Sequence, residues 1–460
     1  MTLIKLPIDV LIENILSWLD AMALIQMSKT CRFFHQLAND EVLWKRLVLS
    51  EFNLPPDASF RQSGWKSLYS RLNNPTVYTW GENFDGRLGH GVGRIGMRRF
   101  YNSRSVPEPR ELVSLRNKGI VDIVAGGWSF HALDRYGHVW MWGTMQEDVP
   151  VTRSLGARPV REPVQLVLPP ETKIRAISCG RSHAIALDYR GEVWHWNNLW
   201  RPQQVLLPSS SKAVQVTANW GYSSVLTEDG EIHVVPQPEL IASFDETNAI
   251  LPELVLDLPG VTLSTVIATS SLNTETAASS VAPDDSFVQL AGLEKYTLAL
   301  TRLGRVFRLH TENRHMFTSS PLTDELVHFS ASTPENNTRR GRMQRFVSGA
   351  FTNFAVYTAD GQVMLGSQNK PPNQQPEIPP GLSHGICKVA FGDYHMGAVT
   401  NTGALLTWGA YSAGALGHGH DNEERQQDTP QQVEALKDMF VFAIGFGGWH
   451  SGVLAIPNHQ

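Results

Sequence analysis

The sequence predicts two domains of different fold class: a small all-α domain, then an all-β seven-bladed propeller closed by the N- and C-terminal strands of one split blade. Two observations carry this prediction. About fifty N-terminal residues show the apolar spacing of helices, and the rest repeats a three-strand unit six times, with part of a unit at each end. Charged residues make up 18% of the chain, below the roughly 25% of an average protein, which favours many short buried strands.

Helical periodicity marks the first part of the chain. Apolar residues recur at the spacing of one helix face at Ile8, Leu11, Ile12, Ile15, Leu16 and Leu19. Pro7 suits a first helical turn, and Asp40 suits the N-cap of the last helix. We therefore expect three or four short helices between residue 6 and about residue 50. Because so small a unit buries little core of its own, we expect it to pack on the rest of the chain or on a partner.

Two segments depart from these patterns. Residues 53–75 are expected to form a linker, in which 60–72 can form one short helix before Asn73, Asn74 and Pro75 stop it. Residues 264–286 are small and polar and lie in an insertion between repeats, so we expect an exposed flexible loop there. The predicted division is thus a helical domain over 1–52, a linker over 53–75 and a propeller over 76–457.

The repeated unit is an apolar strand, a small-residue loop, a second apolar strand, a tight turn closing on glycine, and a third strand. Whole units occupy residues 120–143, 174–196, 213–235, 287–309, 345–367 and 386–409. Their turn glycines, where a hairpin requires positive φ, are Gly137, Gly191, Gly230, Gly304, Gly361 and Gly403. Residues 77–91 supply a third strand and residues 441–457 supply the first two. Joined together, these two parts complete a seventh blade and close the ring.

Composition and motifs exclude several classes of function. The formal net charge of −5 argues against a nucleic-acid partner. The cysteines Cys31, Cys179 and Cys387 are far apart, so neither a disulfide framework nor a cysteine zinc site is expected. No signal peptide, membrane span, P-loop or GxSxG motif is recognisable. We expect an intracellular protein, cytoplasmic and/or nuclear, that is not an enzyme and uses no cofactor or metal.

The loops between the first and second strands hold candidate binding residues. Four aromatic side chains occupy these loops: Trp128, Trp220, Tyr394 and Trp449. Such loops gather on one face of a propeller, where aromatic residues suit the binding of a protein substrate. The alternative, for at least half of them, is packing between adjacent loops. Because His183, His395 and His450 recur at equivalent loop positions, we expect each to be structural and to form a hydrogen bond within its own loop.

The units resemble regulator-of-chromosome-condensation repeats. The pattern of this family is best kept by the Gly392-x-x-His395 loop, the turn glycine Gly403, the Trp408-Gly409 pair and the Leu416-Gly417-x-Gly419 loop. The helical head resembles an F-box, in the segments Leu6–Asp9, Ile15–Leu19, Cys31–Phe34 and Leu43–Leu47. An F-box joined to such a propeller resembles the fungal SCF-associated factor family.

This resemblance implies a non-catalytic substrate receptor of an SCF (Skp–cullin–F-box) ubiquitin ligase. The F-box would dock on the Skp adaptor, and through it on the cullin and RING subunits, while the propeller holds a soluble protein for ubiquitination and proteasomal degradation. The positions assigned to the adaptor interface are Leu6, Pro7, Ile12, Ile15, Leu16, Leu19, Leu24, Cys31, Leu43 and Trp44. The alternative is that some of these, Leu16 and Leu43 especially, hold the head's own helices together.

Two other functions stay open at this point. The repeat family's namesake is a guanine-nucleotide exchange factor for a Ran-type small GTPase, and a shared fold hosts many roles. An F-box protein can also bind the adaptor without recruiting a cullin.

Overall fold

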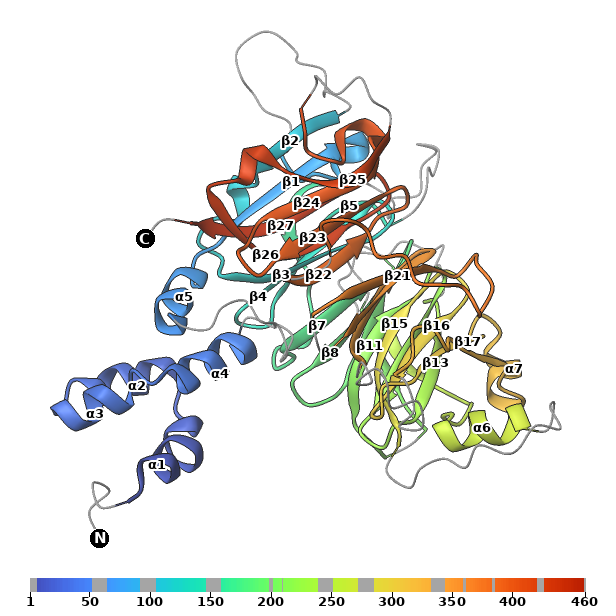
Figure 1. The fold of residues 1–460 in the computed structure, drawn as a ribbon, viewed down its shortest axis with the longest axis horizontal. Helices are drawn as coiled ribbons and strands as arrows, with labels where there is room; N and C mark the ends of the chain where they lie inside the picture. The colour runs from blue at the N-terminus through green and yellow to red at the C-terminus, as the bar shows by residue number, and fades with distance from the viewer. Residues whose placement is uncertain are drawn as a thin grey trace.

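The computed structural model describes residues 6–51, 64–91, 105–145, 159–197, 202–208, 210–238, 251–271, 285–331, 344–358, 361–382, 385–419 and 426–458. A helical head lies at one side of a β-propeller (Figure 1). Seven separate sheets make up the propeller. The predicted fold class, a small helical domain followed by a seven-bladed propeller, is therefore confirmed.

The head consists of short helices with local caps. They are α1 (Ile8–Asn14), the 3-10 turn η2 (Leu16–Trp18), α2 (Ala21–Ser28), α3 (Arg32–Leu37) and α4 (Glu41–Glu51). The Asp20 carboxylate accepts a hydrogen bond from the Ala23 N–H at 2.7 Å, and Asp40 accepts one from the Val42 N–H at 2.8 Å. Each aspartate satisfies backbone donors that the first helical turn leaves free, which is why α2 and α4 begin where they do.

Helix α5 (Trp65–Leu72) lies within the predicted linker and joins the head to the propeller. The Glu41 carboxylate of α4 accepts hydrogen bonds from the N–H groups of Gly64 at 3.1 Å and Trp65 at 2.9 Å. The Trp44 ring packs edge-on against Tyr69 with centroids 5.2 Å apart. These contacts fix the first turn of α5 and its apolar face against α4.

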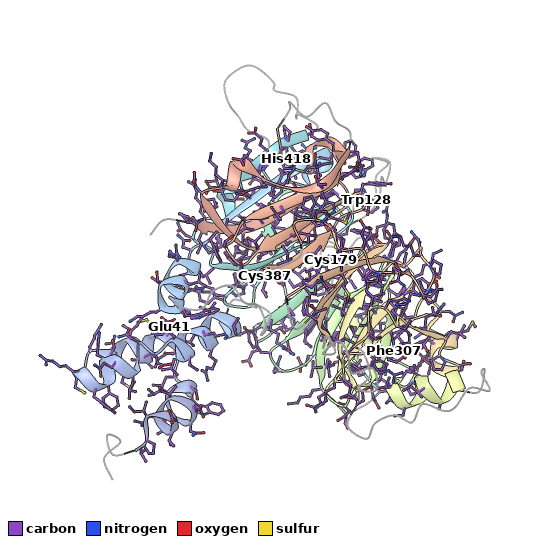
Figure 2. All side chains as sticks on the ribbon, viewed as in Figure 1. Glu41, Trp128, Cys179, Phe307, Cys387 and His418 are labelled. Carbon is purple, nitrogen blue, oxygen red and sulfur yellow. The ribbon has the colours of Figure 1, made fainter. Side chains whose placement is uncertain are left out.

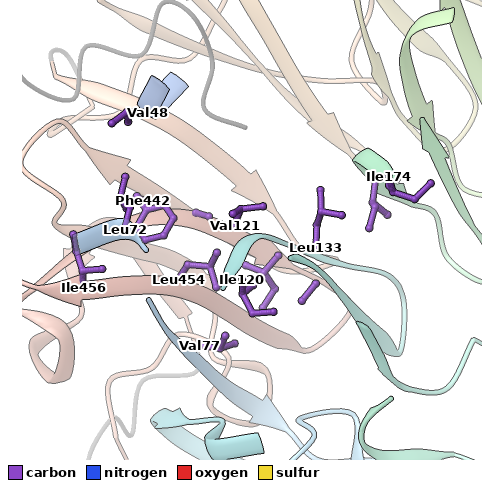
Figure 3. Packing of buried hydrophobic residues seen from close by; sticks show 14 of the residues in the cluster. Val48, Leu72, Val77, Ile120, Val121, Leu133, Ile174, Phe442, Leu454 and Ile456 are labelled. Carbon is purple, nitrogen blue, oxygen red and sulfur yellow. The ribbon is translucent and has the colours of Figure 1, made fainter. Parts of the chain in front are cut away.

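The other end of α5 is bound to the propeller. The Arg71 Nη1 atom donates to the carbonyl of Pro457 at 3.3 Å. Leu72 is fully buried and belongs to the same apolar cluster as Phe442, Leu454 and Ile456 (Figure 3). That cluster also contains head residues, so one continuous core runs from the head through α5 into the propeller.

The blades are numbered from the split one. Blade 1 contains β26 (Met439–Phe446), β27 (His450–Pro457), β1 (Thr76–Glu82) and β2 (Ser105–Glu111). Blade 2 contains β3 (Ile120–Ala125), β4 (Ser129–Asp134), β5 (Val139–Gly143) and β6 (Val160–Gln165). Blade 3 contains β7 (Ile174–Cys179), β8 (Ala184–Asp188), β9 (Val193–Trp196) and β10 (Gln203–Leu206). Blade 4 contains β11 (Ala213–Ala218), β12 (Tyr222–Thr227) and β13 (Ile232–Pro236).

Three further blades complete the ring. Blade 5 contains β15 (Phe287–Gly292), β16 (Thr297–Thr301), β17 (Val306–Leu309) and β18 (Thr323–Glu325). Blade 6 contains β19 (Gln344–Ala350), β20 (Asn353–Thr358) and β21 (Val363–Ser367). Blade 7 contains β22 (Ile386–Phe391), β23 (His395–Thr400), β24 (Leu405–Ala410) and β25 (Gln426–Gln432).

The ring closes through the split blade, as predicted. Strand β1 pairs antiparallel with β27 over six residues, from Thr76 opposite Ala455 to Gly81 opposite His450. The six turn glycines have φ between 78° and 86°, in the left-handed region that a side chain disfavours.

The insertion after blade 4 differs from the expected loop. Strand β14 (Leu251–Val255) pairs parallel with β10 of blade 3, and residues 263–271 form helix α6 (Leu263–Ser271). Leu263 and Val266 are buried, and Ile267 packs against the same cluster. These residues form an apolar stripe on one face of α6, although most residues of this segment are small or polar. The expectation of a loop was therefore wrong for residues 264–271. Residues 272–284 lie outside the described residues.

Buried histidines connect neighbouring blades. The Nε2 atom of His183 lies 2.8 Å from Ser223 Oγ in blade 4, and that of His395 lies 2.8 Å from Ser451 Oγ in blade 1. His450 Nε2 donates to the carbonyl of Ser129 in blade 2 at 3.3 Å. Each of these ring bonds reaches the second strand of the next blade. The expected hydrogen bond within each loop is made by the backbone, because the carbonyls of His183, His395 and His450 accept from the N–H groups of Gly180, Gly392 and Gly447 at 2.8–3.0 Å. These histidines hold adjacent blades in register.

Candidate functional site: a central funnel and a helical docking face

The loops between first and second strands open on one face of the ring, around a cavity of about 890 Å³ that we call the central funnel. All seven blades contribute to it. Its lining residues are Glu82, Phe84, Arg87, Gly127, Trp128, Arg181, Trp220, Glu294, Phe351, Thr352, Asp393, Tyr394, Gly448 and Trp449. Apart from Glu82, Phe84 and Arg87, each occupies one of the two positions between the first and last residues of its four-residue loop. The residues at those two positions differ from blade to blade, so each blade contributes different side chains to the funnel.

The four predicted aromatic residues all line this funnel: Trp128, Trp220, Tyr394 and Trp449. Tyr394 is 60% exposed and Trp449 is 43% exposed, with ring centroids 6.4 Å apart. Large aromatic surfaces open to solvent at the centre of a concave face suit the binding of a partner. Their role in holding a substrate stays a prediction.

Arg181 organises the opposite wall of the funnel. Its guanidinium lies over the rings of both Trp128, at 4.3 Å, and Trp220, at 4.2 Å. Its Nη1 atom is 3.6 Å from an oxygen of Asp393. A planar cation between two indoles is stabilised by cation–π attraction. Trp128 and Trp220 therefore also pack between adjacent loops, whereas Tyr394 and Trp449 face outward.

A bulky residue with an unusual backbone lies beside this wall. Phe351 has φ of 53°, and its carbonyl accepts a hydrogen bond from the Glu294 N–H at 2.6 Å. Its ring meets the edge of Trp220 with centroids 5.4 Å apart. Left-handed backbone at a non-glycine aromatic residue is strained, and such strain concentrates at functional sites.

The charged residues of the funnel were not predicted from the sequence. Arg87 pairs with Glu82 at 2.8 Å, and the carboxylate of Glu294 accepts a hydrogen bond from Gln368 Nε2 at 2.9 Å. Arg181, Glu294 and Asp393 occupy the same variable loop positions as the predicted aromatic residues. Alignment of the repeats therefore contained the signal that locates them.

A second cavity, which we call the side groove, adjoins the funnel. It measures about 710 Å³ and shares Trp220 and Glu294 with the funnel. Its outer wall is the start of helix α7 (Arg314–Ser319), with Glu312 just before it. Arg314 is paired with Asp257 at 2.8 Å. The funnel and groove thus form one depression across blades 4 and 5.

The structure divides the ten predicted adaptor residues by burial. Four are buried within the chain itself: Leu16, Leu24, Leu43 and Trp44. Four are half-buried and pack against the core: Leu6, Ile12, Ile15 and Leu19. Pro7 and Cys31 are exposed. The buried residues hold the head together, so a direct contact with an adaptor falls to the others, and that assignment stays a prediction.

Other apolar residues of the head are exposed and were not assigned from the sequence. They are Ile8 (52%), Val10 (38%), Trp18 (83%), Met22 (63%) and Val42 (63%). A head that leaves a tryptophan this open is suited to covering it against a partner. Ile8 and Trp18 fall within the motif segments of the sequence, but helical phase alone did not tell their outward direction.

The head and the funnel lie at opposite ends of the blade strands. The Arg135 guanidinium in the β4–β5 turn donates to Asn73 just after α5, and Pro457 ends β27 where Arg71 contacts it. These positions follow the second strands, whereas the funnel loops precede them. Figure 2 shows Glu41 of the head and Trp128 of the funnel far apart, with propeller strands between them.

Neither a membrane span nor a metal-binding cluster is found in the part of the chain that the structure describes. No helix there is long and apolar enough to cross a membrane. No three His, Cys, Asp or Glu side chains of those residues gather as a metal site would need.

Family models match both domains. An F-box-like model matches residues 3–50. Models of the regulator of chromosome condensation (RCC1) repeat match residues 76–133 and 402–454, and a second RCC1 repeat model matches 174–196. The matched repeats belong to blades 1, 2, 3 and 7. Blades 1 and 7 keep both the Gly-x-x-His loop and the Trp-Gly pair, whereas blade 3 keeps only the loop and blade 2 only the pair.

The chain is also similar to curated relatives and to solved structures. The F-box protein pof9 of Schizosaccharomyces pombe is 22% identical over 99% of this chain and 90% of its own length. SCF-associated factor 1 of Saccharomyces cerevisiae is 32% identical over 17% of this chain and 15% of its own length. The crystal structure of Prp20p from Saccharomyces cerevisiae has a TM-score of 0.57 at 17% identity, covering 87% of this chain and 96% of that one. The last similarity establishes the propeller fold alone. The chain therefore joins an N-terminal domain that matches an F-box-like model to a seven-bladed propeller in which blades 1, 2, 3 and 7 match RCC1 repeat models.

Proposed function

We propose that this protein is the substrate-recognition subunit of an SCF-type ubiquitin ligase. The head docks on a Skp-type adaptor, which connects it to cullin and RING subunits, and the funnel binds a soluble protein for ubiquitination and proteasomal degradation. The protein itself supplies no catalytic group, nucleic-acid contact or membrane contact, and it acts within the cytoplasm, the nucleus or both. The relative SCF-associated factor 1 is named for its association with the SCF complex, and the similarity of this chain to it favours the proposal.

One observation carries the proposal: two surfaces that suit partners lie at opposite ends of one packed unit. Trp18 is 83% exposed on the head, and Tyr394 is 60% exposed in the funnel. Between them, Glu41 and Trp44 bind α5, and α5 is buried against the propeller. A receptor needs this arrangement, because a substrate must be held at a fixed place relative to the ligase.

Adaptor binding tests the proposal. We expect the full chain to bind a purified Skp-type adaptor in isothermal titration calorimetry. Trp18→Asp should weaken this binding at least about a hundredfold, because it puts a charge where an apolar contact is buried. A Trp44 variant is unsuitable for this purpose, because its side chain is 1% exposed and its loss disturbs the fold.

The matched control is Tyr394→Asp, an equally polar change in the funnel. It should leave adaptor affinity unchanged. An adaptor that does not bind the wild-type chain, or that binds Trp18→Asp as well as the wild type, would contradict the proposal.

Guanine-nucleotide exchange on a Ran-type GTPase is the second candidate. The resemblance of the propeller to Prp20p favours it, because Prp20p is described as binding Gsp1p and histones. The fold is shared by proteins of many functions, and the F-box-like head has no role in exchange. Faster release of labelled GDP from a Ran-type GTPase on adding the purified chain would support exchange over the ligase role.

A further inference from the structure

The funnel and the side groove are large enough together for a polypeptide segment. Their volumes are about 890 and 710 Å³, and Trp220 and Glu294 line both. A single small-molecule site measures about 300–1,000 Å³. The funnel and the side groove together exceed this size and extend from the ring centre to α7. A depression of this length fits an extended chain that crosses blades 4 and 5.

The charges of the funnel are compensated with one exception. Arg87 is paired with Glu82 at 2.8 Å, and Arg181 is paired with Asp393 at 3.6 Å. Within the described ranges, no cation lies within ion-pair distance of Glu294, which accepts only the neutral Gln368 amide. Lys295 follows it in the chain but lines a different pocket of about 190 Å³, together with Glu312. The funnel thus offers one uncompensated carboxylate.

The aromatic residues Trp220 and Phe351 line the funnel together with Glu294. The Glu294 N–H donates to the carbonyl of Phe351, which fixes the two loops together. The Phe351 ring in turn meets Trp220, which lines the funnel beside Glu294. A carboxylate that lines a cavity together with aromatic side chains attracts a cation by charge and hydrogen bonding, and the rings add cation–π attraction.

We propose that the funnel and side groove bind an extended basic segment of the substrate protein, with one lysine or arginine side chain seated against Glu294 beside Trp220 and Phe351. The inference rests on the proposed function, because the segment belongs to the protein that is to be ubiquitinated. An acidic segment fits less well, because the two funnel arginines already have carboxylate partners and Glu294 repels a second anion.

Peptide selection on the immobilised full-length chain tests this inference. The probe is a library of ten-residue peptides, random except for one fixed central residue. Peptides with fixed lysine or arginine should be retained at least about tenfold over those with fixed glutamine or glutamate, the effect of one hydrogen bond to a charged group. Retention should decrease as salt rises from about 50 mM to about 500 mM.

Variants at one position separate this contact from general attraction. Glu294→Gln should abolish the preference for lysine and arginine, and Glu294→Arg should turn it toward aspartate and glutamate. The matched control is Glu434→Gln, on a side chain that is 75% exposed and paired with Lys437 outside the funnel. It should keep the preference. Melting temperatures of all variants show whether each is folded.

Three outcomes would overturn the inference: no basic preference in the wild type, an acidic preference, or a basic preference that persists in folded Glu294→Gln. Adaptor binding is measured on the same preparations. A chain that binds the adaptor without a basic preference contradicts this inference alone. A chain that selects basic peptides without binding the adaptor contradicts the ligase role instead.

Discussion

The helical head and the propeller contrast in how closely their predicted binding residues match the surfaces that the structure exposes. All four predicted loop aromatics line one funnel, although they come from four blades far apart in sequence. Of the ten predicted head residues, four are buried inside the chain. Trp18, the more exposed of the two tryptophans in the head, was not among the ten.

The difference follows from what each kind of pattern specifies. A propeller repeat places equivalent loop positions on one face of the ring, so a residue's place in the repeat tells where it lies. A helical stripe tells only that residues share a face. Whether that face meets the head's own core, α5 or an adaptor is decided by tertiary packing, as Trp44 against Tyr69 shows.

The largest expected difference between the two regions is in how their stability depends on pH: acid should destabilise the propeller more than the head. Burial lowers the pKa of His131 and His395 to about 3 and that of His183 to about 4. Histidines in an unfolded chain titrate near pH 6.5, so the unfolded state binds more protons between about pH 6.5 and 4. The propeller should keep its full stability above this window. It should lose up to about 1.4 kcal/mol per pH unit for each such histidine as pH falls through the window.

Thermal denaturation followed by tryptophan fluorescence at several pH values measures this loss. The head has one histidine among its described residues, His35, and it is exposed. A double variant His183→Gln and His395→Gln should show a shallower dependence on pH. The same slope in that variant as in the wild type would contradict the assignment.

The next largest effect is expected between the two tryptophans of the head, whose replacement by alanine should change the stability by different amounts. Trp44 is 1% exposed, its Nε1 donates to the Ala38 carbonyl at 2.7 Å, and it packs on Tyr69. Trp44→Ala should cost about 3–5 kcal/mol of the head's stability, as removal of a buried tryptophan does. Trp18→Ala should change it by less than about 0.5 kcal/mol, since an exposed side chain is removed. Urea titration with limited proteolysis of the head measures both, and equal losses would contradict the burial of Trp44.

Two turn glycines in different blades should differ in the stability cost of replacement by alanine, although by less than the two tryptophans. Gly403 and Gly361 both have φ of 81°, so either alanine variant should cost about 1–2 kcal/mol for left-handed backbone. A Cβ at Gly403 would overlap the Phe440 ring, whereas none of the described atoms lies within 4 Å of a Cβ at Gly361. Gly403→Ala should therefore cost about 1–3 kcal/mol more than Gly361→Ala by overpacking. Calorimetric melting of both variants measures the difference, which an equal cost would contradict.

Much of the fold was predictable because each position in the repeat has a fixed place in a blade. The turn glycines, the split blade and the funnel aromatics follow from periodic positions. Features that depend on a neighbouring blade were not predictable: His183 reaches Ser223 across a blade boundary, and Val266 of α6 is buried by residues of blades 4 and 5. Arg181 and Glu294 were not predicted because their contacts depend on which residues other blades place beside them.

Capture of the chain from cells with the proteasome inhibited tests whether the head and the funnel are two separate docking ends of one receptor. Adaptor and ubiquitinated proteins are quantified together for the wild type, for Trp18→Asp and for a Tyr394→Ala, Trp449→Ala double variant. We predict that Trp18→Asp loses the adaptor but keeps its bound proteins in unmodified form. The funnel variant should keep the adaptor and lose those proteins. Loss of both partners in either folded variant, or retention of the adaptor by Trp18→Asp, would contradict the account.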